Sequence, residues 1–226
     1  MSANEFVLDR DRPRRLGFGE AIFCLDKSPS QIQAIAQSAH ERGEALLLTR
    51  LAPQQVTELA PPVRDALDYD PVSRTAHLGQ PPPPGPARVA VVSAGTSDVP
   101  VAKEAVRTLL FNGHSCDEHY DVGVAGLWRL LERLDAIKGF EVVIAVAGMD
   151  AALPSVLGGL LASPIIAVPT STGYGATHRG HTALHAILAS CAPGLLTVNI
   201  DNGYGAACGA LRILQGAHRR DSALKT

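Results

Sequence analysis

From residue 88 onwards, short runs of apolar residues alternate with segments in which apolar residues recur at helical spacing. The runs are rich in β-branched residues, which is typical of strands that are buried on both faces. The pattern predicts strands at Arg88–Ser93, Glu141–Val146, Ser163–Val168 and Leu195–Ile200. It predicts helices at Pro100–Leu110, Val122–Leu134, Leu153–Leu161, His181–Ser190 and Ala206–Gln215.

Strands that alternate with helices in this way predict an α/β fold, a Rossmann-like parallel sheet between two layers of helices. Ligands of such folds bind at the carboxyl ends of the strands. Each predicted strand is followed by an unusual loop, and these loops are Ser93–Asp98, Ala147–Asp150, Pro169–Gly175 and Asn199–Gly205. Because four such loops lie on one edge of the sheet, we expect them to form a site.

The segment before this pattern is separate from it. Residues 80–86 are so rich in proline that they cannot continue a helix or a central strand, and we interpret them as a stiff linker. Residues 1–79 then form an N-terminal unit, and residues 87–226 form a C-terminal one. The N-terminal unit contains a predicted helix at Ser30–Glu41 with a capping signal at Ser28-Pro29, a strand at Ala45–Thr49 and a short helix at Pro53–Leu59. It is either a small α+β unit or an arm that docks on a neighbouring subunit.

Composition excludes several classes of function. A formal charge of -2 and a pI near 6.4 give no sign of a nucleic-acid partner, and the basic stretch Arg10–Arg15 fits a polar terminus better than a phosphate-binding arm. No window approaches the roughly 20 consecutive apolar residues that span a bilayer. Charged residues at Asp9–Arg12 occupy the place where a signal peptide would be apolar. We therefore expect a soluble, cytoplasmic protein without a membrane partner.

The 4 cysteines do not form a recognisable framework. None of them lies in a Cys-x-x-Cys pair, so the sequence predicts neither a structural zinc site nor any other metal centre. A disulfide framework is not expected at this chain length. Free cysteines in such a chain are usually buried as small apolar side chains.

The loop Ser93-Ala-Gly-Thr-Ser-Asp98 joins a predicted strand to a predicted helix. Gly95 allows a tight turn, and the free N–H groups at the start of the helix suit an anion such as phosphate. An ordinary capped turn between a strand and a helix explains the segment equally well. The loop is similar to the Gly-Ser-x-Ser-Asp loop with which the aminoimidazole ribonucleotide (AIR) carboxylase/mutase family holds its substrate.

A further resemblance covers almost the whole chain. It rests on strings in the C-terminal part and on one string in the N-terminal part. These are Tyr69–Thr75, Tyr120–Leu130, Ala147–Ser155, Ala167–Ala176, Ser190–Gly194 and Val198–Gly205. Each of them resembles the LarB family, the pyridinium-3,5-biscarboxylic acid mononucleotide synthases of nickel-pincer cofactor biosynthesis.

This resemblance implies a function. Members of the family carboxylate nicotinic acid adenine dinucleotide with carbon dioxide or bicarbonate and cleave its phosphoanhydride, which releases AMP. It also implies a carboxylase/mutase-like catalytic domain at 87–226 and, from the related carboxylase/mutase family, a homo-octamer. No tightly bound cofactor is implied, and any Mg²⁺ that takes part would bind partly through the substrate phosphates.

The resemblance singles out Cys191 as the nucleophile, and the chemistry supports that role. A pyridinium ring is electron-poor, so it cannot attack carbon dioxide. When a thiolate adds to ring carbon 6, carbon 5 becomes an enamine-like nucleophile that can take up carbon dioxide. Cys191 ends a predicted helix in front of Pro193-Gly194, where a loop can expose it. The alternative is a buried structural cysteine, which is how we interpret Cys24, Cys116 and Cys208.

Asp150 is the second candidate catalytic residue. The family usually has glutamate at this position, and the resemblance implies that its carboxylate removes the ring proton. Aspartate reaches about 1.5 Å less far because it lacks one methylene group. Movement of the backbone or of the substrate must offset that difference. The alternative is a carboxylate that caps the following helix.

The loops also supply candidate substrate-binding residues. They are Ser93, Gly95, Thr96, Ser97, Asp98, Asp121, Gly123, Gly148, Met149, Pro169, Thr170, Gly173, Tyr174, Gly175, Arg179, His181, Asp201, Asn202 and Gly203. Asp201 and Asn202 are either turn formers or contacts to ribose and phosphate. Arg179 either binds an anion or lies in a solvated loop, and His181 is the next candidate base after Asp150.

Two other functions remain open at this point. One is a diverged carboxylase/mutase that acts on another pyridinium or aminoimidazole nucleotide, which the aspartate at position 150 and His181 motivate. The other is a non-catalytic nucleotide-binding oligomer, against which the presence of both Cys191 and a carboxylate at position 150 argues.

Overall fold

A computed structural model describes residues 6–223, which form two compact units. Unit 1 comprises residues 6–83 and 111–113, and unit 2 comprises residues 84–110 and 114–223. The chain in unit 1 forms α1 (Arg12–Leu16), β1 (Ala21–Phe23), α2 (Pro29–His40), β2 (Leu46–Thr49), α3 (Pro53–Thr57), α4 (Pro61–Arg64), β3 (Leu67–Asp70) and β4 (Thr75–Leu78).

Unit 1 is a small α+β unit built on a 4-stranded mixed sheet in the order β1-β2-β4-β3. β1 is parallel to β2, and the other pairs are antiparallel. Helix α2 begins with a capping box in which Ser28 and Gln31 each accept the other's backbone N–H. Its apolar side, including Ile32 and Ile35, packs into the core of the unit.

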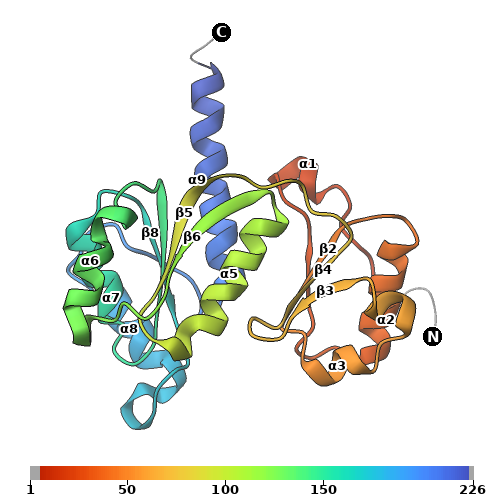
Figure 1. Ribbon diagram of the computed structural model, residues 1–226, viewed down its shortest axis with the longest axis horizontal. Helices are drawn as coiled ribbons and strands as arrows, with labels where there is room; N and C mark the ends of the chain where they lie inside the picture. The colour runs from red at the N-terminus through yellow and green to blue at the C-terminus, as the bar shows by residue number, and fades with distance from the viewer. Residues whose placement is uncertain (1–5, 224–226) are drawn as a thin grey trace. The chain divides into compact units, whose positions relative to one another are not determined.

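Unit 2 contains the longer pattern of strands and helices (Figure 1). Its strands are β5 (Gly85–Ser93), β6 (His114–His119), β7 (Val142–Ala147), β8 (Ile165–Pro169) and β9 (Leu196–Thr197). Its helices are α5 (Val99–Phe111), α6 (Leu127–Ile137), α7 (Ala152–Leu160), α8 (His181–Leu188) and α9 (Gly203–Ala223), and its 3₁₀ turns are η1 (Thr96–Asp98), η2 (Val124–Gly126) and η3 (Gly175–Gly180).

The strands of unit 2 form a 5-stranded sheet in the order β6-β5-β7-β8-β9, and every pair is parallel. One face of the sheet packs against α6, α7 and α8 through a common apolar core. The other face carries α5 and α9, as Figure 1 shows. The predicted three-layer α/β fold with a small N-terminal α+β unit is therefore confirmed.

Strand β6 is the main element of unit 2 that the pattern of apolar residues did not predict. Its sequence, His-Ser-Cys-Asp-Glu-His, is polar because β6 is an edge strand with one free side. At the opposite edge, β9 has only 2 residues where a 6-residue strand was predicted. Strand β6 was missed because an edge strand needs no apolar run. Strand β9 was predicted, but its pairing with β8 ends after 2 residues although the apolar run continues.

The bounds of the linker and of one helix differ from the predicted ones. Strand β5 starts at Gly85, inside the segment that was interpreted as a linker. The helix expected over Val122–Leu134 divides into the turn η2 and the helix α6. Within residues 6–223, no helix combines the length and the apolar character that a bilayer span needs.

The strand order places a topological switch between β5 and β7. From β5 the chain passes through α5 to β6 on one side, and from β7 it passes through α7 to β8 on the other. The loops after β5 and β7 therefore leave the sheet toward opposite faces. A crevice opens between such loops, and this is where ligands of open parallel sheets bind.

Gly203 allows the two helices on one face of the sheet to pack closely. A Cβ atom at this position would collide with the carbonyl oxygen of Val101 and lie 3.0 Å from the backbone nitrogen of Ala105. The backbone N–H of Tyr204 donates to the buried carboxylate of Glu104, 3.2 Å away. The start of α9 is thus held against α5.

We predict that Gly203→Ala lowers the free energy of unfolding by about 1–3 kcal/mol, because the added methyl group forces α9 away from α5. Gly216→Ala on the same helix is the matched control. A Cβ atom there meets nothing within 4 Å, so the substitution should stabilise the protein by about 0.5–1 kcal/mol. Urea unfolding of both variants tests the prediction, and equal stabilities would contradict it.

Candidate active site

A cleft of about 610 Å³ opens at the switch between β5 and β7. The loops after β5, β6 and β7 line it, and Thr172 after β8 adds to it. Its lining residues are Ala94, Gly95, Thr96, Ser97, Asp98, Asp121, Gly123, Val124, Ala125, Arg129, Ala147, Gly148, Met149, Asp150, Ala151, Ala152, Leu153 and Thr172. Two of the loops that were predicted to form a site, those after β5 and β7, thus meet at the carboxyl ends of the strands.

The carboxylate of Asp98 joins two of these loops. The Gly95 N–H donates to Asp98 Oδ2 at 3.0 Å, and the Thr170 hydroxyl donates to Asp98 Oδ1 at 2.6 Å. Asp98 is only 3% exposed, so both of its oxygens are used inside the protein. A second bond, from the Thr172 hydroxyl to the Ser97 carbonyl at 3.3 Å, links the same loops. Thr96 and Ser97 remain exposed at the cleft.

The backbone around Asp150 is held in an unusual conformation. Met149 and Ala151 on either side of it have φ of 55° and 47°. Such left-handed conformations are unfavourable for residues with a side chain and often occur at functional sites. Gly148 permits the close approach of the β8 loop, because a Cβ atom there would lie 2.6 Å from the Thr170 hydroxyl oxygen. The Met149 N–H donates to the Thr172 carbonyl at 3.0 Å and closes the loop.

This geometry places the Asp150 side chain in the cleft. Asp150 is exposed and lines the cleft. Helix α7 has its N-cap at Ala151 and shows no side-chain capping bond. The side chain of Asp150 therefore does not cap α7.

A guanidinium group lies on the β6 side of the cleft. Arg129 on α6 donates from Nη1 to Asp121 Oδ2 at 2.7 Å. Its Nε–H is buried and has no hydrogen-bond partner among residues 6–223, but the guanidinium as a whole is partly exposed where Arg129 lines the cleft. Because one carboxylate partner leaves donors of the guanidinium unused, Arg129 can bind a carboxylate or phosphate of a ligand.

Cys191 lies elsewhere in unit 2. It belongs to the connection between α8 and β9 and does not line the cleft. The neighbouring Ala192 packs close to Gly158 of α7, and Ser190 shares a hydrogen bond of 2.6 Å with Ser155. The structure therefore does not bring the two predicted catalytic residues, Cys191 and Asp150, together within one chain.

The other cysteines differ from Cys191 in exposure. Burial raises the pKa of the Cys24 thiol to about 12. Burial and the nearby carboxylates of Glu118 and Asp117 raise the pKa of Cys116 to about 12 as well. Cys208 is half-buried on α9, whereas Cys191 is exposed. Because the thiolate is the nucleophilic form, the accessible Cys191 is the better candidate.

The loops after β8 and β9 contribute little to the cleft lining. Pro169 and Thr170 are buried at the end of β8, and Ser93 is buried at the end of β5. Exposed residues of the β8 loop and of the start of α8 lie at the carboxyl edge but outside the lining, and these are Gly173, Tyr174, Gly175, Arg179 and His181.

The polar groups of the β9 loop are used within the protein. Asp201 Oδ1 accepts the N–H of Ser171 at 2.7 Å, and Asn202 Oδ1 accepts the N–H of Gly205 at 2.8 Å. Gly203 packs on α5. Asp201 and Asn202 therefore act as turn-forming residues. Sequence reasoning did not include Thr172, Val124 or Ala125 in the site. Thr172 lies in one of the loops already singled out, but the two apolar residues gave no chemical signal.

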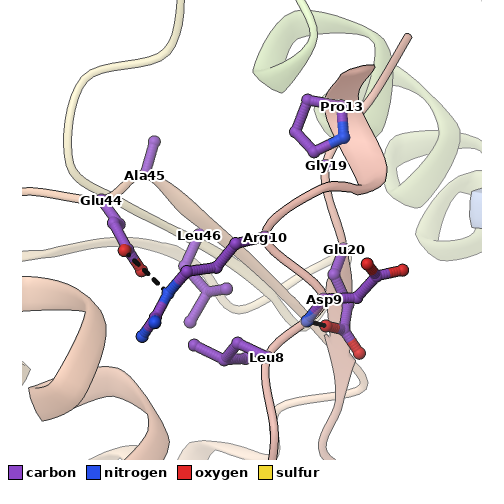
Figure 2. A pocket seen from close by; sticks show the side chains of 9 residues that line it. All are labelled: Leu8, Asp9, Arg10, Pro13, Gly19, Glu20, Glu44, Ala45 and Leu46. Carbon is purple, nitrogen blue, oxygen red and sulfur yellow. Dashed lines mark hydrogen bonds and ion pairs between the residues drawn. The ribbon is translucent and has the colours of Figure 1, made fainter. Parts of the chain in front are cut away.

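A second hollow, of about 200 Å³, lies in unit 1 (Figure 2). Its charged side chains have partners within the protein. Arg10 Nε lies 3.0 Å from Glu44 Oε1, and Glu20 Oε2 accepts the backbone N–H of Asp9 at 2.8 Å. The cleft of unit 2 is larger and presents an exposed carboxylate and a guanidinium group, so we take it as the candidate active site.

Comparisons with known proteins show the family of the chain. Residues 88–225 match the model of the AIR carboxylase family, and residues 3–80 match that of the LarB/PurE-like N-terminal domain. An uncharacterized protein of Methanocaldococcus jannaschii is 46% identical over 134 residues, which cover 58% of this chain and 51% of that protein. The chain thus spans about half the length of this relative.

Two further relatives are N5-carboxyaminoimidazole ribonucleotide mutases. The one from Pyrococcus abyssi is 35% identical over 58% of this chain and 75% of its own length. The one from Methanocaldococcus jannaschii is 34% identical over 56% of this chain and 78% of its own length. The fold, the cleft at the switch point and these matches together place the chain in the AIR carboxylase family, with an N-terminal domain of the LarB/PurE-like type.

Proposed function

We propose that this protein carboxylates the pyridinium ring of nicotinic acid adenine dinucleotide and hydrolyses its phosphoanhydride, which gives pyridinium-3,5-biscarboxylic acid mononucleotide and AMP. The observation that carries the proposal is a carboxylate, Asp150, held in the cleft of a chain that also exposes a cysteine thiol at Cys191. The LarB/PurE-like N-terminal domain supports this substrate over an aminoimidazole nucleotide.

The carboxylation needs a nucleophile and a base. The Cys191 thiolate adds to ring carbon 6, and the electron pair displaced from the ring makes carbon 5 nucleophilic. Carbon 5 then forms a bond to carbon dioxide. Asp150 removes the proton from carbon 5, and the electrons of that bond expel the thiolate and restore the aromatic ring. Every electron pair is accounted for, and no oxidant is required.

The cleft offers the groups that such a substrate needs. Its volume lies within the range of about 300–1,000 Å³ that is usual for small-molecule sites. Arg129 can pair with the carboxylate that the nicotinate ring already carries. The exposed loop at Thr96 and Ser97 can donate hydrogen bonds to phosphate oxygens. A Mg²⁺ ion held partly by the substrate phosphates would favour the attack of water on the phosphoanhydride. By the same proposal the working form is a homo-octamer.

We expect Cys191→Ala to fold normally and to form no carboxylated product, because the ring can no longer be activated. Cys208→Ala is the control, since that thiol is half-buried on α9 and should leave turnover unchanged. The measurement is mass spectrometry of the nucleotide after incubation with nicotinic acid adenine dinucleotide and bicarbonate. Product formed by Cys191→Ala at the wild-type rate would rule out the covalent mechanism.

We expect Asp150→Asn to bind the substrate normally and to slow turnover by about 10²–10⁴-fold, because an amide cannot accept the ring proton. Asp150→Glu restores a carboxylate with the longer reach and should retain much of the activity. Rapid-quench analysis should show a carboxylated adduct on Cys191 that accumulates in Asp150→Asn. Normal turnover of Asp150→Asn would mean that another group, with His181 as the next candidate, is the base.

The preferred substrate should carry a carboxylate rather than a carboxamide on its ring. Loss of a charge-assisted hydrogen bond costs about 1.5–3 kcal/mol, so nicotinic acid adenine dinucleotide should be favoured about 10- to 100-fold over the amide. The test is the ratio of kcat/KM for the two dinucleotides. Arg129→Ala should abolish the preference, whereas Arg179→Ala, outside the cleft lining, should preserve it. Equal kcat/KM values in the wild type would refute the selectivity.

A further inference from the structure

The Cys191 thiol is not held by a bond of its own. The side chain is exposed, and no hydrogen bond within residues 6–223 fixes its sulfur atom. Cys191 belongs to the connection between α8 and β9, which contains no helix or strand. The direction of the thiol therefore depends on the backbone of this connection and on the groups that hold that backbone in place.

Ser190 closes a small turn around Cys191. Its hydroxyl oxygen accepts the backbone N–H of Ala192 at 3.1 Å, so the bond spans the cysteine. Serine hydroxyls stabilise turns in this way, although more weakly than the side chains of aspartate and asparagine. The bond also requires the Ser190 side chain to keep one rotamer. Such a turn is better defined when a second group holds the hydroxyl.

Ser155 on α7 provides this second group. Its hydroxyl oxygen lies 2.6 Å from that of Ser190, and either of the two can donate the hydrogen bond. Both side chains are partly buried, which limits competition from water for the bond. The Ser190 oxygen is thus bonded both to the turn that contains Cys191 and to the side of α7.

Gly158 lets the same connection approach α7 on the other side of Cys191. A Cβ atom at position 158 would lie only 2.8 Å from the Cβ atom of Ala192. Because Ser155 and Gly158 are three residues apart in a helix, they lie on the same side of it. Helix α7 therefore contacts the connection both before and after the cysteine, through Ser190 and Ala192.

We propose that Ser155 and Gly158 are positioning residues for Cys191, because they hold its connection against α7 and so fix the direction of the thiol. The inference rests on the proposed function, in which the Cys191 thiolate adds to ring carbon 6. That addition requires the sulfur to approach one carbon atom at about 3–3.5 Å with the correct orientation. Neither positioning residue lines the cleft, so their substitution should leave substrate binding unchanged.

Ser155→Ala should lower kcat about 10- to 100-fold and leave KM unchanged, because the thiol loses its orientation while the cleft keeps its lining. Ser163→Ala is the matched control. The Ser163 hydroxyl donates to the Phe140 carbonyl, also at 2.6 Å, but in the segment that leads into β8. The measurement is the kinetics of carboxylation of nicotinic acid adenine dinucleotide. A wild-type kcat for Ser155→Ala, or an equal loss in Ser163→Ala, would overturn the inference.

A double-mutant cycle tests whether Ser155 acts through Ser190. Ser190→Ala should lower kcat to a similar extent, because the turn loses its closing bond. The double variant should be no slower than Ser190→Ala alone, since the Ser155 hydroxyl then has nothing left to hold. Losses that multiply in the double variant would show that the two hydroxyl groups act independently, which contradicts the inference.

Gly158→Ala moves the connection with both hydroxyl groups intact. The added methyl group must displace Ala192, so kcat should fall here as well. Gly159→Ala, one residue further along the same helix, is the control, because a Cβ atom there meets nothing within 4 Å. Equal kcat values for the two glycine variants would overturn the inference, even if the serine variants failed to fold.

Alkylation separates the orientation of the thiol from its reactivity. Iodoacetamide is small and uncharged, so it should modify the exposed Cys191 at the same rate in the wild type and in Ser155→Ala. Mass spectrometry of the peptide that contains Cys191 gives the rate at this thiol alone. A fall in the alkylation rate that matches the fall in kcat would mean that the variant changes reactivity rather than orientation, and the inference would fail.

The outcomes also distinguish the inference from the proposed function. Carboxylation by Cys191→Ala at the wild-type rate would refute the proposed function, and the inference would fall with it. If Cys191→Ala is inactive while Ser155→Ala and Gly158→Ala match the wild type, the inference alone is overturned. A loss of kcat in both of these variants, with both controls fully active, supports it.

Discussion

The buried carboxylate of Asp98 is the interaction on which the candidate site depends. Its two oxygens hold the loop after β5 against the loop after β8, although β7 lies between these strands. Because both oxygens accept hydrogen bonds, the cost of burying this carboxylate is partly offset. With these loops fixed, Gly148 and the left-handed residues beside Asp150 can place that side chain in the cleft. The placement of the candidate base Asp150 therefore depends on Asp98, which has a structural role.

The fold could be predicted from the sequence wherever burial imposed a pattern. Strands β5, β7 and β8 are covered on both faces, so their apolar runs were visible, and the helices between them were visible by their spacing. The edge strand β6 could not be found in this way, because one side of it is free and its sequence is polar. The other edge strand, β9, was found but predicted too long. The strands β1, β3 and β4 of unit 1 were missed, whereas β2, which is equally short, was found because Leu46–Leu48 is a continuous apolar run.

The site was predictable in part, for a related reason. Parallel strands bring their carboxyl ends together, so the loops at Ser93–Asp98 and Ala147–Asp150 could be expected to meet. The sequence could not show which polar atoms of those loops the protein uses itself, as it does at Asp98, Asp201 and Asn202. Nor could it show that Cys191, which follows α8, lies outside the cleft that Asp150 lines.

The edges of the sheet in unit 2 limit how copies of this protein can associate. On β6, the exposed Asp117 and Glu118 place negative charge beside the unpaired backbone groups. At the other edge, β9 offers only 2 residues for pairing. Charged and very short edge strands resist the addition of further strands, which is the common route to aggregation. These edges therefore disfavour extension of the sheet from one copy into another, and leave helices and loops as the surfaces through which copies would associate.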